Sequence, residues 1–174
     1  MALTLIKEDG TGKIDANTYA SVADCDAYHE AHLYASAWTA ASAVDKDKAL
    51  AMATRLMDAE FAFNGTRKST TQALQWPRED CPAPDEAGGE FVAINVVPKP
   101  VISAACEMAR ELILADRTGA PMGEGLASTR LADSSIVFDK ADRRPVLTAL
   151  VQVMLAKYGA PIAPPGGVAR LVRT

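Results

Sequence analysis

The chain has 174 residues, of which 49% are hydrophobic and 6% aromatic, and its formal net charge is -4. This length corresponds to one domain, with or without appendages, which buries roughly 70% of its unfolded surface and needs no staples to fold. The acidic balance argues against an obligate nucleic-acid binder, because such domains carry a basic patch. It is compatible with a conduit for DNA, whose acidic wall repels phosphates.

Three scattered cysteines, Cys25, Cys81 and Cys106, do not constitute a disulfide framework. No signal peptide is visible, and the longest apolar run, residues 146–156, is shorter than the roughly 20 residues of a membrane span. We therefore expect the protein to fold in a reducing cytoplasm.

The first part of the chain predicts an extended arm followed by two helices. The arm covers residues 1–18, and Ser21 is a candidate N-cap for a helix over residues 22–37. A second helix begins at Asp45 and stops before Gly65. The expected apolar faces are Ala23, Ala27, Ala31, Tyr34 and Trp38 in the first helix, and Leu50, Ala53, Met57 and Phe61 in the second.

Residues 64–100 predict a long irregular loop, because five prolines within them rule out a continuous helix. Loops of this length in a compact domain are usually functional or interfacial. Pro100 suits the first turn of a third helix, which continues to about residue 117.

The C-terminal part predicts a short hairpin, a helix and a tail. Residues 128–131 and 135–138 form the hairpin, and Pro145 opens the fourth helix. This helix is apolar on two faces, with Leu147, Leu150, Val151, Met154, Leu155 and Tyr158 on one and Val146, Ala149 and Val153 on the other. A helix that is apolar nearly all round is buried, either in its own domain or in a partner.

We therefore predict a mainly α fold: a four-helix bundle-like domain with a long irregular loop, a short β-hairpin and an extended C-terminal tail. The organisation is an N-terminal arm (1–18), a helical domain (19–159) with the 64–100 loop inserted, and a tail (160–174). The apolar and basic tail suits the sheet edge or groove of a partner. Its candidate docking residues are Ile162, Val168, Arg170, Leu171, Val172 and Arg173.

Chemistry-bearing motifs are scarce. Cys25, His29 and His32 have helical spacing and could converge on a metal, but the second ligand cluster of a structural zinc site is missing. We favour a helix face with a buried cysteine and predict no metal site. Neither a nucleophile elbow nor a phosphate loop is present. We therefore predict no catalytic residue, no cofactor and no enzymatic activity.

Trp76, Pro77 and Arg78 form an aromatic, proline and basic cluster in the long loop. With Arg67 and Lys68 as candidate DNA-facing residues, this loop could stack on and neutralise single-stranded DNA. The alternative is that Trp76 fills the core beneath the loop, Pro77 sets the exit direction and Arg78 anchors the surface. We favour this second interpretation, in which the three residues are a structural loop anchor.

An ordered set of segments resembles a family of small tailed-phage proteins encoded among head-assembly functions. The segments lie at residues 8–12, 16–24, 27–28, 38, 49–58, 63–65, 74–78, 97–98 and 104–109, and include Phe63-Asn64-Gly65 and Leu74-Gln75-Trp76-Pro77-Arg78. That family has two descriptions. One is a DnaT-like single-stranded-DNA-binding protein, and the other is similarity to the head–tail connectors, or neck adaptors, of long-tailed phages.

The connector description implies a virion protein that forms a ring, typically dodecameric, under the portal. Its implied partners are other copies of itself, the portal protein, a tail-side stopper or tail-completion protein, and genomic double-stranded DNA passing through the lumen without sequence-specific binding. It also implies that the C-terminal tail docks on the portal, and that the protein resides in the virion neck after assembly in the host cytoplasm. We favour this description over the alternative of a DnaT-like single-stranded-DNA-binding accessory protein, because the chain is acidic and ends in a hinge and a short peptide.

Overall fold

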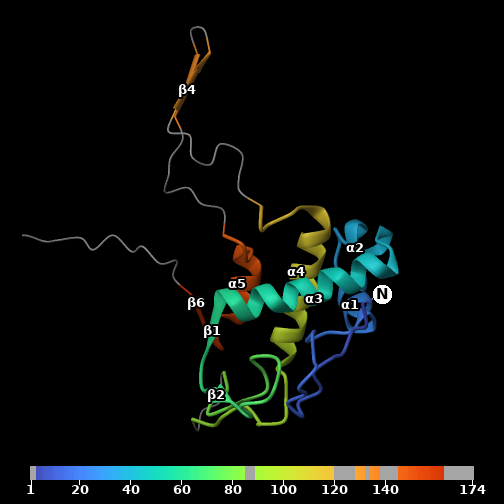
Figure 1. The fold of residues 1–174 in the computed structure, drawn as a ribbon, viewed down its shortest axis with the longest axis vertical. Coiled ribbons are helices and arrows are strands. Elements are labelled where there is room, and N and C mark those ends of the chain that lie inside the picture. The colour runs from blue at the N-terminus through green and yellow to red at the C-terminus, as the bar shows by residue number, and fades with distance from the viewer. Residues whose placement is uncertain (1–2, 85–88, 120–127, 132–133, 138–144, 163–174) are drawn as a thin grey trace, which may run out of the picture.

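The computed structural model describes residues 3–84, 89–119, 128–131, 134–137 and 145–162. Its helices are α1 (Val22–Glu30), α2 (Ser36–Ala40), α3 (Ala43–Glu60), α4 (Lys99–Leu114) and α5 (Ala149–Leu155). Its strands are β1 (Phe61–Phe63), β2 (Thr66–Arg67), β3 (Arg78–Glu79), β4 (Ser128–Leu131), β5 (Ser134–Val137) and β6 (Gly159–Pro161). Figure 1 shows α3 lying across α4, with α1 and α2 near one end of α3 and α5 near the other.

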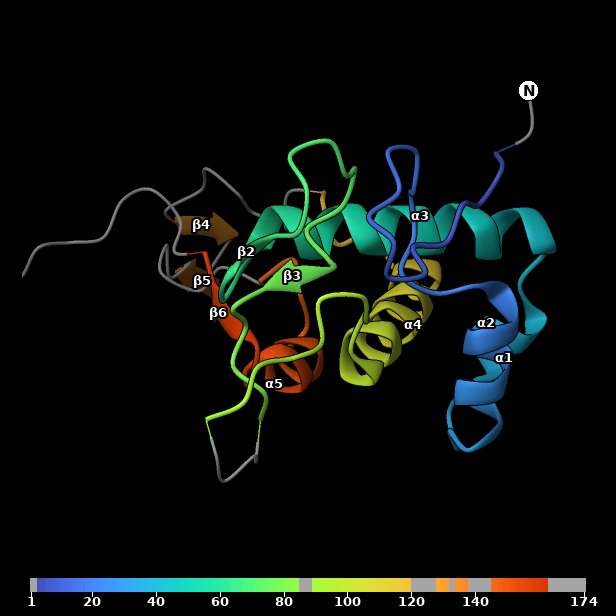
Figure 2. The ribbon, with the colours of Figure 1, turned by 90° about the horizontal axis from the view of Figure 1, so that it is seen from below.

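The predicted four-helix bundle-like fold is wrong. The described residues form a mixed arrangement of helices and small two-stranded sheets, which pair β1 with β6, β2 with β3, and β4 with β5. Two of the helices, α2 and α5, have only five and seven residues, too short to form the parallel rods of a bundle. The core is instead built where α3 and α4 pack together, with α5 and the loops closing it, as the view in Figure 2 shows.

The predicted first helix is interrupted. Ser21 is the N-cap and forms a capping box with Asp24, as expected from the sequence, but α1 ends at Glu30 and a separate α2 begins at Ser36. Between them the His32 ring accepts a hydrogen bond from the Tyr34 backbone N–H (3.0 Å), which favours a turn over a helix.

The expected buried face of this helix is also wrong. Of the five residues predicted to form this face, only Trp38 is buried. The other four are exposed: Ala23, Ala27, Ala31 and Tyr34. Cys25 and His29 face the core instead.

The second and third helices are predicted more closely. The apolar residues of α3 and the following strand, Leu50, Ala53, Met57 and Phe61, are all buried. The cap of α3 is Ser42, whose hydroxyl accepts from the Asp45 N–H, so the helix starts two residues earlier than predicted. Helix α4 begins at Lys99 and ends at Leu114, which is short of residue 117.

The last described segment, strand β6, lies beside strand β1 at the end of α3. Strand β6 pairs antiparallel with β1, so that Phe63 lies opposite Gly159, and the Ile162 N–H donates to the Glu60 carbonyl (2.8 Å). A Cβ on Gly159 would lie 2.1 Å from the Ala62 carbonyl oxygen, so the close approach requires glycine. This pairing joins the region after α5 to the end of α3.

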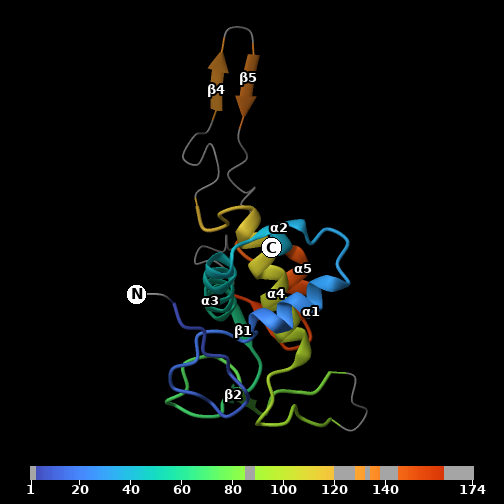
Figure 3. The same ribbon diagram turned by 90° about the vertical axis from the view of Figure 1, so that its right-hand side faces the viewer.

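The predicted hairpin is confirmed, with β4 and β5 antiparallel and Ser128 opposite Val137. Figure 3 shows the hairpin lying away from the helical body.

The cysteine pattern predicted no disulfide framework, and this prediction is wrong for one pair of cysteines. Cys25 of α1 and Cys106 of α4 are disulfide-bonded, while Cys81 is free and buried. The bond joins residues 81 positions apart. Their proximity depends on the packing of α1 on α4, which no local spacing reveals.

Candidate functional site

Trp76 is the first residue of the predicted loop anchor, and it is fully buried. Its ring lies edge-on to Phe63 of β1 (centroids 5.8 Å apart) and to Tyr158 after α5 (5.9 Å). Such edge-to-face contacts add to the stabilisation from burial. Trp76 thus packs against one end of the β1–β6 pair, where Phe63 lies opposite Gly159, and presents no ring face to solvent.

Arg78, a residue that is 6% exposed, holds the loop through its guanidinium. Its Nε donates to the Asn64 carbonyl (2.7 Å), and its Nη2 donates to the carbonyls of Phe63 (3.1 Å) and Gly65 (2.6 Å). Its Nη1 donates to the backbone and side-chain oxygens of Gln75, both at 3.0 Å. All five N–H groups of an arginine are therefore used. Burial lowers the pKa of Arg78.

Tyr19 and Asp58 fix the other side of the loop. The Tyr19 hydroxyl donates to Asp58 Oδ1 (2.5 Å) and accepts from the backbone N–H groups of Gln75 (3.1 Å) and Trp76 (3.2 Å). Asp58 Oδ2 accepts from the Gln75 N–H as well (3.0 Å). Burial raises the pKa of Asp58 to about 6 and that of Tyr19 well above its usual value. The loop anchor is therefore a set of structural contacts: Trp76 lies in the core beneath the loop, whereas Arg78, which we expected at the surface, is buried.

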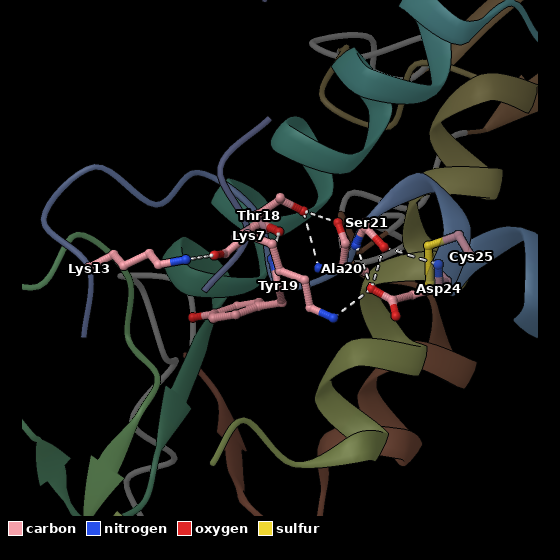
Figure 4. A network of polar contacts seen from close by, with 10 residues as sticks. Lys7, Lys13, Thr18, Tyr19, Ala20, Ser21, Asp24 and Cys25 are labelled. Atoms are coloured by element: carbon pink, nitrogen blue, oxygen red, sulfur yellow. Dashed lines mark hydrogen bonds and ion pairs between the residues drawn. A yellow bond between two sulfur atoms is a disulfide. The ribbon is translucent and has the colours of Figure 1, made fainter. Parts of the chain in front are cut away.

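A buried carboxylate folds the N-terminal segment into a turn. Glu8, 1% exposed, accepts backbone N–H groups from Gly10 (2.8 Å), Gly12 (2.9 Å) and Lys13 (2.8 Å). Gly10 has a φ of +96°, and a Cβ there would lie 1.8 Å from the Asn95 carbonyl oxygen. This geometry requires glycine. The segment continues into the polar contacts of Figure 4, where Lys7 reaches Asp24 on α1 (2.7 Å).

The candidate DNA-facing residues have different environments. Arg67 is exposed on β2 and donates to the Gln72 carbonyl at 3.4 Å. Lys68 is half-buried and donates to the Gly10 carbonyl (3.1 Å). Lys68 therefore links the long loop to the N-terminal segment, and Arg67 alone of the two lies open to solvent.

The Cys25, His29 and His32 pattern does not assemble into a metal centre. The Cys25 sulfur is bonded to Cys106, the buried His29 ring lies 3.2 Å from the Cys106 carbonyl oxygen, and His32 lies 3.7 Å from Glu107. Within the part of the chain that the structure describes, no group of three or more histidine, cysteine or acidic side chains is placed to hold a metal ion.

Exposed apolar side chains are a feature that the sequence pattern did not predict. Between α1 and α2, Leu33 is 85% and Tyr34 is 74% exposed, and on α5 Val153 is 71% exposed. The tail residues Val168, Arg170, Leu171, Val172 and Arg173 lie outside the described residues, and Ile162, at their boundary, is exposed. Among the described helices none is long and apolar enough to cross a membrane.

Comparison with known proteins identifies one family. The family model described as "Putative DnaT-like ssDNA binding protein" matches residues 3–173. The chain belongs to this DnaT-like family. No curated protein and no solved structure matches it.

Membership of the DnaT-like family supports one of the two descriptions that the sequence resemblance offered. The match covers the N-terminal segment, the loop anchor, the hairpin and nearly the whole tail. The family description does not mention a portal, a ring or a virion neck.

Proposed function

We propose that this member of the DnaT-like family is a structural head–tail connector, which forms an oligomeric ring under the portal, joins the capsid to the tail and lets DNA pass. The observation that carries this proposal is a contrast in exposure. Trp76, the aromatic residue best suited to stack on DNA bases, is 0% exposed, whereas Leu33, Tyr34 and Val153 are each more than 70% exposed. Leu33 and Tyr34 are neighbours in the turn between α1 and α2, and adjacent exposed apolar side chains suit a contact with another protein.

The remaining chemistry of the loop supports the same proposal. Arg78 donates its N–H groups to backbone and amide oxygens. The Lys68 ammonium donates to the Gly10 carbonyl oxygen. A protein that binds nucleic acid needs such groups directed at phosphates. The net charge of -4 lets DNA pass the protein without strong adhesion, because like charges repel.

In this proposal the C-terminal tail docks on the portal through Ile162, Val168, Arg170, Leu171, Val172 and Arg173. The chain leaves the described structure at Ile162, directly after β6, and this side chain is 48% exposed. A tail that starts from a paired strand has a fixed origin on the body, which reduces the entropy lost on docking.

The test is deletion of residues 163–174, which leaves strand β6 and the Ile162 hydrogen bond to Glu60 intact, in the phage that encodes the protein. We expect full-length protein at a ring-like copy number in purified virions, located in the neck by imaging of labelled particles. We expect the truncated protein to be lost from heads that carry a portal. Full occupancy by the truncated protein would refute portal docking by the tail, and absence of the full-length protein from virions would refute the connector role.

A second candidate function is single-stranded-DNA binding, and the description of the DnaT-like family favours it. Exposed groups that suit such binding are Arg67 on β2 and Phe91, which is 57% exposed. A binder that neutralises several phosphates loses affinity steeply as salt rises. The assay is fluorescence anisotropy of a labelled oligonucleotide over a range of salt concentrations. Absence of binding at low salt would exclude this function, whereas steep salt dependence that weakens in Arg67→Ala would support it.

A further inference from the structure

Helix α1 is held on the body by few apolar contacts. Of its nine residues only Cys25 and His29 are buried, while Val22 and Tyr28 are partly buried. Isolated helices shorter than about 12–15 residues are marginally stable in water, so a helix of this length depends on its packing against the rest of the fold. The position of α1 is therefore decided by its contacts with α4, which lies beside it in Figure 3.

The contact between α1 and α4 contains buried polar groups that are not fully paired. On α4, Glu107 is 1% and Arg110 is 9% exposed. The His29 Nε2 atom lies 3.2 Å from the Cys106 carbonyl oxygen, but among the described residues His29 Nδ1, Glu107 Oε2 and Arg110 Nε have no hydrogen-bond partner. The nearest cationic group to Glu107 Oε2 on this side is His32, at 3.7 Å. Such atoms destabilise the contact, because they have given up hydrogen bonds with water.

The ion pairs of α1 lead to other elements. Lys7 of the N-terminal segment reaches Asp24 (2.7 Å), as Figure 4 shows, and Lys46 of α3 reaches Asp26 (2.8 Å). The Trp38 indole N–H of α2 also donates to Asp26 (2.7 Å). Each ion pair includes a side chain that is at least a third exposed, and ion pairs at the surface contribute little to stability. They do not hold α1 against α4.

The disulfide is the strong link between the two helices. Cys25 lies within α1 and Cys106 within α4, 81 positions away in the sequence. A cross-link removes the chain conformations in which its two ends separate, so it keeps α1 against α4 whatever the balance of the other contacts. Both cysteines are fully buried, but Asp26 and Ala27 are exposed, so Cys25 lies directly beneath the surface. A reductant reaches the bond when α1 opens transiently.

We propose that the Cys25–Cys106 bond is a redox-sensitive switch: reduction releases α1 from α4, because the polar groups between them then regain water, and oxidation holds α1 in place. A dithiol reductant supplies the two electrons and two protons. One of its thiolates attacks a sulfur and breaks the S–S bond, forming a mixed disulfide, and its second thiol then displaces the protein thiol. The products are two cysteine thiols and the oxidised reductant. A small-molecule disulfide accepts the same two electrons and restores the bond.

The position of α1 thus follows the redox compartment. Thiols are kept reduced in a cytoplasm, whereas disulfides persist in oxidising surroundings. The oxidised chain has α1 fixed on α4, and the reduced chain has α1 released and Glu107 and Arg110 open to water. This inference goes beyond the proposed function and does not depend on it, since neither a ring nor a nucleic acid takes part.

The test is hydrogen exchange of the full-length chain, measured by mass spectrometry with the disulfide intact and after reduction by dithiothreitol. On reduction we expect the protection of residues 22–30 in α1 to fall at least about tenfold, and residues 49–57 in α3 to remain at least about tenfold better protected than α1. The variant Cys25→Ala with Cys106→Ala should show the released α1 under both conditions. The matched control is Cys81→Ala, because Cys81 is a free thiol, and it should respond to dithiothreitol as the wild type does.

A second variant tests the role of the polar groups. Glu107→Met with Arg110→Met replaces the buried ion pair by apolar side chains, a change that is often neutral or stabilising. In this variant we expect the protection of α1 to change by less than about threefold on reduction. Release of α1 in the methionine variant as in the wild type would refute the stated cause.

Three results with the other proteins would overturn the switch itself. The first is undiminished protection of α1 in the reduced wild type. The second is an equal loss of protection in α1 and α3, because reduction would then lower only the global stability. The third is a response to dithiothreitol that persists in the Cys25→Ala, Cys106→Ala variant, because the disulfide would then not be its origin.

Discussion

Replacement of Arg78 by lysine tests whether the guanidinium stabilises the long loop. The arginine donates five hydrogen bonds to oxygens of Phe63, Asn64, Gly65 and Gln75. A lysine ammonium has three donors at a single point, so at least two of these bonds are lost. A hydrogen bond from a charged donor contributes roughly 1.5–3 kcal/mol, and two lost bonds therefore lower the free energy of unfolding by roughly 3–6 kcal/mol.

The assay is equilibrium unfolding in urea, followed by tryptophan fluorescence, since Trp38 and Trp76 are both fully buried. The matched control is Arg67→Lys. Arg67 is exposed and makes one long hydrogen bond, so its replacement should change the free energy of unfolding by less than about 0.5 kcal/mol. A loss below about 1 kcal/mol for Arg78→Lys would show that the five bonds do not hold the loop, and the reasoning would fail.

Three further predictions concern other parts of the structure. Removal of the disulfide in Cys25→Ala with Cys106→Ala should lower the free energy of unfolding by about 4–5 kcal/mol in the chain-entropy model, and a reductant should have no further effect on this variant. Gly10→Ala should lower it by well over about 1 kcal/mol, because the new Cβ meets Asn95, whereas Gly89→Ala, with positive φ but open space, should cost only about 1 kcal/mol. The pKa of Asp58 is raised by burial from 3.8 to about 6, so its contribution to stability is fully present below pH 3.8 and is lost as pH rises through 6. The loss is about 3 kcal/mol. Urea unfolding between pH 3.5 and 7 checks this, since Asp58→Asn should show a weaker fall than the wild type, and equal curves would contradict the assignment.

Local pattern was sufficient for the long helices. The spacing of Leu50, Ala53 and Met57 identified the buried face of α3, and all three are fully buried. The Ser21 cap and the β4–β5 hairpin were also predicted, because capping and hairpin signals lie within a few residues of one another. Such features depend on neighbours in the sequence and need no knowledge of the remaining fold.

Long-range contacts were not predictable in the same way. The β1–β6 pairing joins three-residue strands far apart in the chain, too short for any alternation to be recognised. The turn that divides the first helix brings Trp38 back to Asp26, which accepts a hydrogen bond from the indole N–H (2.7 Å). The Cys25–Cys106 bond likewise depends on α1 packing on α4.

Composition, helical spacing and turn residues by themselves determined that this is an acidic chain with two long helices, an irregular loop between them and a short hairpin, because these properties are carried by residues near one another. Only the tertiary structure decided that Trp76 and Arg78 are buried and stabilise the loop. It also decided that one face of α5 and the residues between α1 and α2 remain exposed. Burial depends on which segments meet in space. In an open loop, Trp76 and Arg78 could contact nucleic acid. In this fold they anchor the loop, because Phe63 and Tyr158 pack against Trp76 and the backbone carbonyls around Gly65 bind Arg78.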